Sequence, residues 1–204
     1  MFEVDVKLLI SSLVAFIVLI NPVHKILVIN SLQNQFDDKD LRYLSIKSTI
    51  TAMIILILFL FLGQLIFNYV FHIELYAFKI TCGIVLMFNG LTGLQKGMFL
   101  QIDKNLKLED VSAVPIAMPM IAGPATITAA VTFPSHYGKI ITIISILLAL
   151  GLNLLIMLYA KKIGRILIKY NFMNALIRIT GLIVATIGLQ MIFDGITNFI
   201  GTLS

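Results

Sequence analysis

Charged side chains are scarce in this sequence. They make up 12% of the 204 residues, whereas 59% of the residues are hydrophobic and the mean hydropathy is +1.03. A soluble domain usually has about 25% charged and about 45–50% apolar residues, so this chain has too few polar side chains to cover a water-soluble globule. The composition excludes a cytosolic enzyme and indicates an integral membrane protein.

Residues that could support catalysis or hold a metal are also few. The single cysteine, Cys82, lies within an apolar stretch, which excludes a disulfide framework and a cysteine-rich metal site. The three histidines, at positions 24, 72 and 136, are scattered, and the sequence has neither an H-E-x-x-H nor a G-x-S-x-G motif. We therefore predict that the chain is not an enzyme and that it holds no cofactor and no metal.

Long hydrophobic runs dominate the sequence instead. Six runs of about 20 apolar residues are each long enough to cross a hydrocarbon core of about 30 Å, and helices satisfy their own backbone hydrogen bonds there. Only short polar segments separate the runs. We predict an all-α membrane protein with six transmembrane helices in a single integral membrane domain over residues 1–204. The expected spans are residues 8–31, 48–71, 75–95, 111–133, 140–160 and 177–200.

The net charge of +5 sets an expected orientation. Lys and Arg concentrate on the cytoplasmic loops of membrane proteins, so the excess positive charge indicates topology, and we expect no nucleic-acid partner. Ten basic residues fall in the expected loops after spans one, three and five, and three fall on the opposite side. We predict a multi-pass protein of the bacterial inner membrane with both termini on the periplasmic or extracellular side. The ten are Lys39, Arg42, Lys47, Lys96, Lys104, Lys107, Lys161, Lys162, Arg165 and Lys169, and the three are Lys7, Lys79 and Lys139.

The chain contains an internal repeat. Residues 79–85 (K-I-T-C-G-I-V) and 178–184 (R-I-T-G-L-I-V) share a basic-Ile-Thr-x-x-Ile-Val pattern 99 positions apart, and Pro22 and Pro124 are 102 positions apart. Each half holds three spans, an odd number, so the second half enters the membrane from the opposite side. We predict two inverted three-helix repeats in which the first and fourth helices are broken. The repeats cover about residues 1–100 and 101–204.

Both prolines fall near the middle of their spans. Each removes a backbone donor and leaves the carbonyl four residues back without its helix partner. A plain kink is the simpler interpretation of one such proline, but Asn21 and Gly123, which precede the prolines, tolerate unwound backbone. Broken helices at matching positions of two inverted halves are typical of a secondary transporter's substrate site. Half-helix N-termini attract a carboxylate and freed carbonyls attract an ammonium, and a zwitterionic amino acid has both groups.

The region around the second proline carries a family resemblance. Residues 114–128 (V-P-I-A-M-P-M-I-A-G-P-A-T-I-T) resemble the span-four signature of the MarC family of six-span bacterial and archaeal inner-membrane proteins, which reads roughly P-L-A-x-P-L-L-A-G-P-G-A-I-T. Ala125 replaces the second glycine. Residues 178–184 and 190–196 resemble the closing helix of the family, and residues 38–42 its charged first loop. The resemblance covers nearly the whole chain and implies uptake or export of small neutral amino acids such as glycine or alanine.

Span one departs from the family pattern. Where the family has N-P-I-G-x-x-P, this chain keeps Asn21 and Pro22 but has His24 for the glycine and Leu27 for the second proline. These changes narrow the conformations open to the break and make the following helix more regular. A non-transporting membrane protein with an altered ligand site is therefore one alternative to a transporter. A cation or metal-ion exporter or channel is another, since freed carbonyls bind ions.

The candidate substrate-binding residues surround the two breaks. They are Asn21, Pro22, Gly123, Pro124, Thr126 and Thr128. The two threonines could instead bond back to helix carbonyls, which is the commoner behaviour. The small-molecule substrate and the lipid bilayer are the expected partners, and a homo-oligomer stays open.

Two ionisable residues, His24 and Asp194, are candidates for coupling or gating, because such groups inside spans are costly and often functional. The structural alternative for His24 is to cap freed backbone or, with Lys25, to reach the membrane surface. The alternative for Asp194 is a position at the interface.

Overall fold

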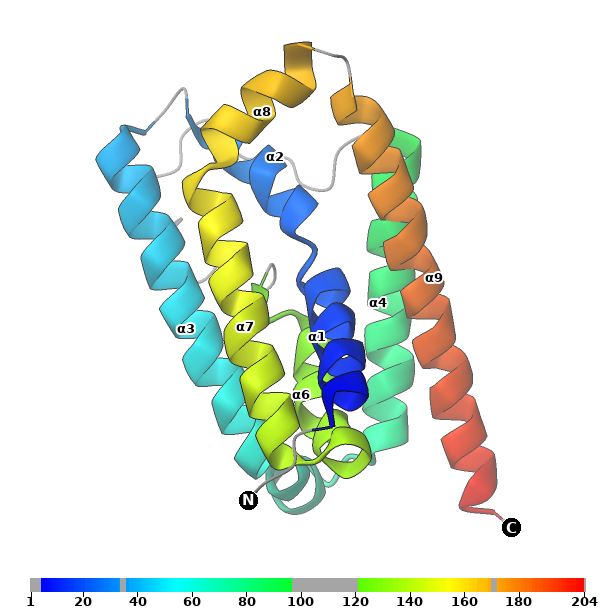
Figure 1. The fold of residues 1–204 in the computed structure, drawn as a ribbon. Helices are drawn as coiled ribbons and strands as arrows, with labels where there is room; N and C mark the ends of the chain where they lie inside the picture. The colour runs from blue at the N-terminus through cyan, green and yellow to red at the C-terminus, as the bar shows by residue number, and fades with distance from the viewer. Residues whose placement is uncertain (1–4, 34–35, 97–120, 170–171, 204) are drawn as a thin grey trace.

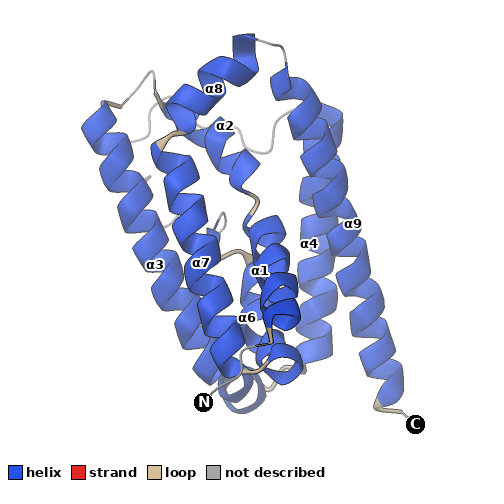
Figure 2. Ribbon diagram, in the orientation of Figure 1, coloured by secondary structure: helices blue, strands red, loops and turns tan. Residues whose placement is uncertain are grey.

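The computed structural model describes residues 5–33, 36–96, 121–169 and 172–203, and this part of the chain is helical with no strand (Figure 2). The predicted all-α class is thus confirmed for these residues. The helices are α1 (Val6–Ile20), α2 (Pro22–Leu32), α3 (Asp38–Leu65) with a π-helical continuation η1 (Ile66–Phe71), α4 (Leu75–Lys96), α6 (Pro124–Tyr137), α7 (Lys139–Leu158), α8 (Ala160–Lys169) and α9 (Phe172–Gly201).

Five segments of the described chain are long and apolar enough to cross a membrane. They are Val6–Asn30, Asp38–Phe71, Leu75–Gln95, Lys139–Leu158 and Asn174–Gly201. These segments correspond to the expected spans one, two, three, five and six. The expected fourth span begins at residue 111, and its part before residue 121 lies outside the described residues, while α6 forms the remainder. The arrangement of six spans as inverted repeats stays a prediction.

Two of the expected charged loops are helical, so their predicted boundaries are wrong. The second span was expected to begin at residue 48, but α3 begins ten residues earlier, at Asp38. Asp38 and Asp40 lie in its first turn, where carboxylates stabilise the partial positive charge of a helix N-terminus. The expected loop after span five contains α8, which lies obliquely across the end of the bundle (Figure 1).

The helices form a four-helix group with a helix pair beside it. In the group, α1 packs on α7, and α3 packs on α6 and α7. The pair consists of α4 and α9, which lie side by side along most of their length (Figure 1). The start of α1 and the end of α9 lie at one end of the bundle, and α8 lies at the other (Figure 1). Buried apolar side chains of the four-helix group form the core, among them Phe16, Ile20, Leu44, Leu56, Ile146 and Leu150.

Close backbone contact joins α4 and α9. A Cβ atom built on Gly90 would lie 2.6 Å from the carbonyl oxygen of Gly181, and one on Gly83 would lie 2.6 Å from that of Gly188. Glycines seven residues apart on one helix therefore meet glycines seven residues apart on the other, in reversed order. Small residues let helix backbones approach closely in membranes, so these glycines fix the pairing.

Candidate functional site

The first break lies at Asn21, between the end of α1 at Ile20 and the start of α2 at Pro22. Asn21 has φ 55°, in the left-handed region that asparagine tolerates better than most residues. Its N–H donates to the carbonyl of Ile17 (3.0 Å), and its side-chain oxygen accepts from the backbone N–H of His24 (3.3 Å). A single residue thus ends one helix and caps the next, and span one is interrupted as its proline predicts.

The second break lies before α6, which begins at Pro124. Gly123 is extended, with φ −78° and ψ 174°, a conformation that any residue adopts. Gly123 is thus outside the helix, as the sequence predicts, but its conformation does not require glycine, and of the two residues only Asn21 is left-handed. The hydroxyl of Thr126 donates to the carbonyls of Ile121 and Gly123, both at 2.9 Å. Thr126 thereby bonds back to two carbonyls at the break, and that of Gly123 also accepts the backbone N–H of Ile127 (2.9 Å).

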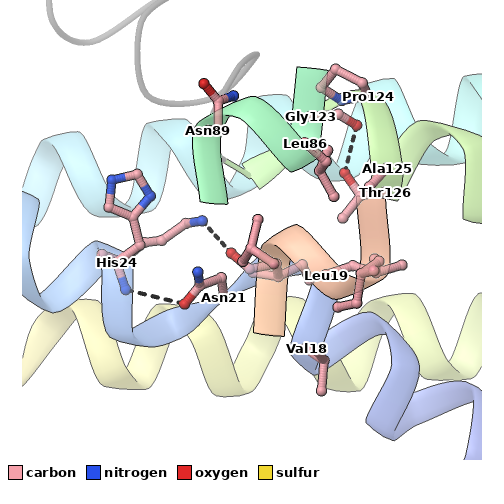
Figure 3. A pocket seen from close by; sticks show the side chains of 14 residues that line it. Val18, Leu19, Asn21, His24, Leu86, Asn89, Gly123, Pro124, Ala125 and Thr126 are labelled. Carbon is pink, nitrogen blue, oxygen red and sulfur yellow. Dashed lines mark hydrogen bonds between the residues drawn. The ribbon is translucent and has the colours of Figure 1, made fainter. Parts of the chain in front are cut away.

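Both breaks border the same cavity (Figure 3). Its volume is about 160 Å³, below the roughly 300–1,000 Å³ typical of pockets for drug-sized ligands. Five of the predicted site residues line it, namely Asn21, His24, Gly123, Pro124 and Thr126. The N-terminal ends of α2 and α6 therefore meet at one small cavity between helices.

A buried lysine also lines this cavity. Lys25 is 1% exposed, and its ammonium donates a hydrogen bond to the carbonyl of Ile20, the last residue of α1. The expectation that Lys25 extends to the membrane surface is wrong, because its side chain runs back along the break to a carbonyl that the interrupted helix leaves open. The cavity thus contains a basic side chain, and none of its described lining residues is acidic. The sequence signal that could have placed Lys25 at the site is its position, three residues after the mid-span proline Pro22.

The helix pair contributes the other wall of the cavity. Leu86 and Asn89 line it from α4, and Val184 and Ile187 line it from α9. Asn89 was not among the site residues predicted from the sequence. Its position in the middle of a hydrophobic span was a signal, but only the fold shows that it lies beside the breaks (Figure 3).

The remaining predicted residues lie elsewhere. Pro22 begins α2 but does not line the cavity, and the hydroxyl of Thr128 donates to the carbonyl of Pro124 (2.9 Å). Thr128 and Asp194 line a second cavity, of about 400 Å³. Asp194 accepts a hydrogen bond from Gln190 (2.8 Å) and is exposed.

The second cavity adjoins the first. Lys79 and His136 line it near the start of α4 and the end of α6, so it lies nearer the end of the bundle that holds the termini (Figure 1). The two cavities share wall residues Val18, Leu19, Ala125 and Ile187. The residues around both breaks and those around Asp194 are thus separated by an apolar wall.

Comparison with known proteins places this arrangement in a family. The chain is 35% identical over 189 residues to a UPF0056 membrane protein of Pyrococcus horikoshii, with 93% of each chain covered. It is 32% identical over 205 residues to one of Methanocaldococcus jannaschii (94% of this chain and 97% of the relative) and 27% identical over 203 residues to one of Aquifex aeolicus (95% and 94%). No solved structure matches the chain.

The sequence model of one family, the MarC family of integral membrane proteins, matches residues 6–200, which is nearly the full length of the chain. It includes both helix breaks and the helix pair that line the cavity. The resemblance seen in the sequence is confirmed, and the chain belongs to the MarC family of integral membrane proteins.

Proposed function

We propose that the chain is a secondary transporter that moves small neutral amino acids, such as glycine and alanine, across the membrane by uptake or export. The observation that carries this proposal is the cavity between the two helix breaks, where the N-termini of α2 and α6 meet beside the buried Lys25. Helices broken at a shared site are typical of transporter substrate sites. The resemblance to the MarC family supports the same substrate class.

The cavity offers partners for a carboxylate. The ammonium of Lys25 supplies positive charge at the cavity wall. Gly123, which precedes α6, has no side chain that could cap the first turn of that helix. The N–H groups of an uncapped first turn, together with the helix dipole, favour an anionic group. A carboxylate placed between Lys25 and α6 would thus be bound without a second buried side-chain charge.

The cavity also offers partners for an ammonium. The carbonyls of Ile20 and Ile121 each accept a hydrogen bond from a side-chain donor at one of the two breaks. A carbonyl oxygen has two lone pairs, so each of these two is able to accept a further hydrogen bond from a ligand. The volume of about 160 Å³ suits a small zwitterion and excludes bulky side chains.

The arrangement favours this function over transport of a free cation. A cation in the cavity would lie close to the ammonium of Lys25, and like charges in a medium of low dielectric constant repel strongly. None of the described lining residues is acidic and able to offset that repulsion. A zwitterion avoids the problem because its carboxylate faces the lysine.

The second cavity provides a route of access. It lies nearer the termini, and Lys79, Gln190 and Asp194 add polar groups to its mostly apolar wall. We propose that it is the vestibule on the periplasmic or extracellular side, that Asp194 takes part in coupling or gating there, and that the basic end of the bundle faces the cytoplasm. The shared wall would then open during transport.

The function is tested with purified protein in proteoliposomes. We expect counterflow of labelled glycine and alanine, and uptake under a proton or a sodium gradient. Leucine tests the size limit and should be moved poorly, while a monovalent cation such as rubidium tests the ion alternative. Absence of flux of every small amino acid under both gradients would contradict the proposal.

A further inference from the structure

A basic pocket lies at the end of the bundle opposite the termini. The first turns of α3, the end of α7 and the start of α8 enclose a volume of about 470 Å³. Arg42 lines it from α3, and Lys161, Lys162 and Arg165 line it from α8. The one described acidic residue in its wall, Asp38, forms an ion pair with Lys161. The walls therefore carry an excess of three positive charges.

An apolar groove adjoins the basic pocket. It runs between α7 and α8 and has a volume of about 390 Å³, with Ile156, Ile163 and Ile166 among its walls. Leu155, Tyr159 and Lys162 line both the groove and the pocket, so the two are continuous. Leu155 is 54% exposed, as expected for a surface that faces acyl chains. The basic pocket is thus joined to an apolar groove on the outside of the bundle.

The orientation of α8 is fixed by α2. The side-chain amide of Asn30 donates to the carbonyls of Ile26 (2.7 Å) and Ala160 (2.9 Å), which ties the start of α8 to α2. Gly164 faces Asn30 so closely that a Cβ atom on it would collide with the asparagine side chain. This buried contact holds the opposite, basic face of α8 beside the pocket. The backbone of α8 that frames the pocket is therefore held in place by contacts within the chain.

We propose that the pocket binds the phosphate headgroup of an anionic phospholipid, with one acyl chain in the groove. Basic pockets between transmembrane helices favour anionic headgroups, and the guanidinium groups of Arg42 and Arg165 suit a phosphate because they donate two parallel hydrogen bonds. The continuous apolar groove selects a lipid over free phosphate, which has no apolar part. The site is separate from the cavity at the breaks and does not rest on the transport proposal.

The proposal is tested by lipid binding to the purified full-length chain. Native mass spectrometry and thermal unfolding in detergent compare phosphatidylglycerol, phosphatidylcholine and inorganic phosphate. We expect phosphatidylglycerol to bind at least fivefold more tightly than phosphatidylcholine and to raise Tm, and phosphate to do neither. Arg42→Gln and Arg165→Gln should each weaken phosphatidylglycerol binding about fivefold, because one basic residue near the surface contributes about that factor.

Two further variants make the test specific. Asp38→Asn removes the carboxylate that pairs with Lys161, so phosphatidylglycerol should bind more tightly, by about the same factor. A merely structural ion pair would give the opposite sign. Lys139→Gln, which removes an exposed charge at the start of α7 near the other end of the bundle, should leave binding unchanged.

Three outcomes would overturn the proposal. Equal losses in Lys139→Gln and Arg165→Gln would show a net-charge effect without a site. Equal protection by inorganic phosphate would show an anion site that does not recognise lipid. Equal binding of phosphatidylcholine would show that the headgroup charge does not matter.

Discussion

The ammonium of Lys25 donates a hydrogen bond to the backbone carbonyl of Ile20, across the break between α1 and α2. This contact has two consequences. It satisfies a carbonyl that the interrupted helix leaves open, which would otherwise cost several kcal/mol in a membrane. It also holds the basic side chain of Lys25 beside the N-termini of α2 and α6, in a cavity of about 160 Å³.

Lys25→Gln separates these two consequences. The glutamine amide is able to donate to the carbonyl of Ile20 but carries no charge, so we expect a folded protein whose glycine transport falls at least tenfold. Lys25→Met removes the donor as well, and should lower the free energy of unfolding by about 1–3 kcal/mol because a buried carbonyl loses its partner. Thermal unfolding in detergent and glycine counterflow measure the two effects.

Lys139→Gln is the matched control for the charge, since Lys139 is exposed at the start of α7. It should leave both stability and glycine counterflow unchanged. Full transport by a well-folded Lys25→Gln would show that the lysine is structural only, while the transport proposal would stand if wild-type counterflow is observed.

Asn21 should be the most sensitive residue of the first break. Asn21→Ala loses the cap on the N–H of His24 and places alanine at φ 55°, so we expect a loss of about 2 kcal/mol. Asn21→Gly keeps the left-handed conformation and should cost only a few tenths of a kcal/mol. Chemical or thermal unfolding in detergent ranks wild type, Gly and Ala in that order. Equal stability of the two variants would show that the backbone conformation contributes nothing.

The contact between α4 and α9 should not tolerate an added methyl group. A Cβ atom on Gly90 would lie 2.6 Å from the carbonyl oxygen of Gly181, and a backbone atom cannot rotate away. Gly90→Ala should therefore push the helices apart and destabilise the protein by about 1–3 kcal/mol. Gly151→Ala is the control, because nothing lies within 4 Å of a Cβ atom on that residue of α7. It should be neutral or slightly stabilising, since alanine favours helix.

The spans and the first break could be predicted from the sequence because each depends on a local cause. Hydrophobic runs of about 20 residues have few alternatives to membrane helices, and Pro22 removes a donor wherever the helix lies. The start of α3 at Asp38 was missed because hydropathy marks the apolar part of a helix and not its polar extension. The same reason explains why α8, with its basic residues, was expected to be a loop.

The contents of the cavity could not be predicted, because they depend on which helices meet. The sequence places Lys25 near a span end, where a lysine usually reaches the surface, but the break redirects its side chain to Ile20. Asp194 lies in the same hydrophobic run as Val184 and Ile187, yet only the latter two line the cavity at the breaks. The distinction follows from helix rotation and packing, which a single sequence does not specify.

Ala125 should set the size of the substrate. It is 4% exposed, lines both cavities and stands where the MarC signature has a glycine. Ala125→Val adds two methyl groups to the wall, so we expect alanine transport to fall about tenfold more than glycine transport. A difference of one methylene group in a pocket is worth about 1–3 kcal/mol, which makes a factor of this size reasonable.

Ala125→Gly should change selectivity in the opposite direction, because it enlarges the cavity by one methyl group. Competition between labelled glycine and unlabelled alanine in proteoliposomes measures the ratio for wild type and both variants, and thermal unfolding checks that each is folded. Because Ala125 lies in the first turn of α6, glycine there costs at most about 1 kcal/mol in stability. A glycine-to-alanine ratio that is the same in all three folded proteins would mean that the substrate does not contact this wall, and the site would then have to lie outside the cavity between the breaks.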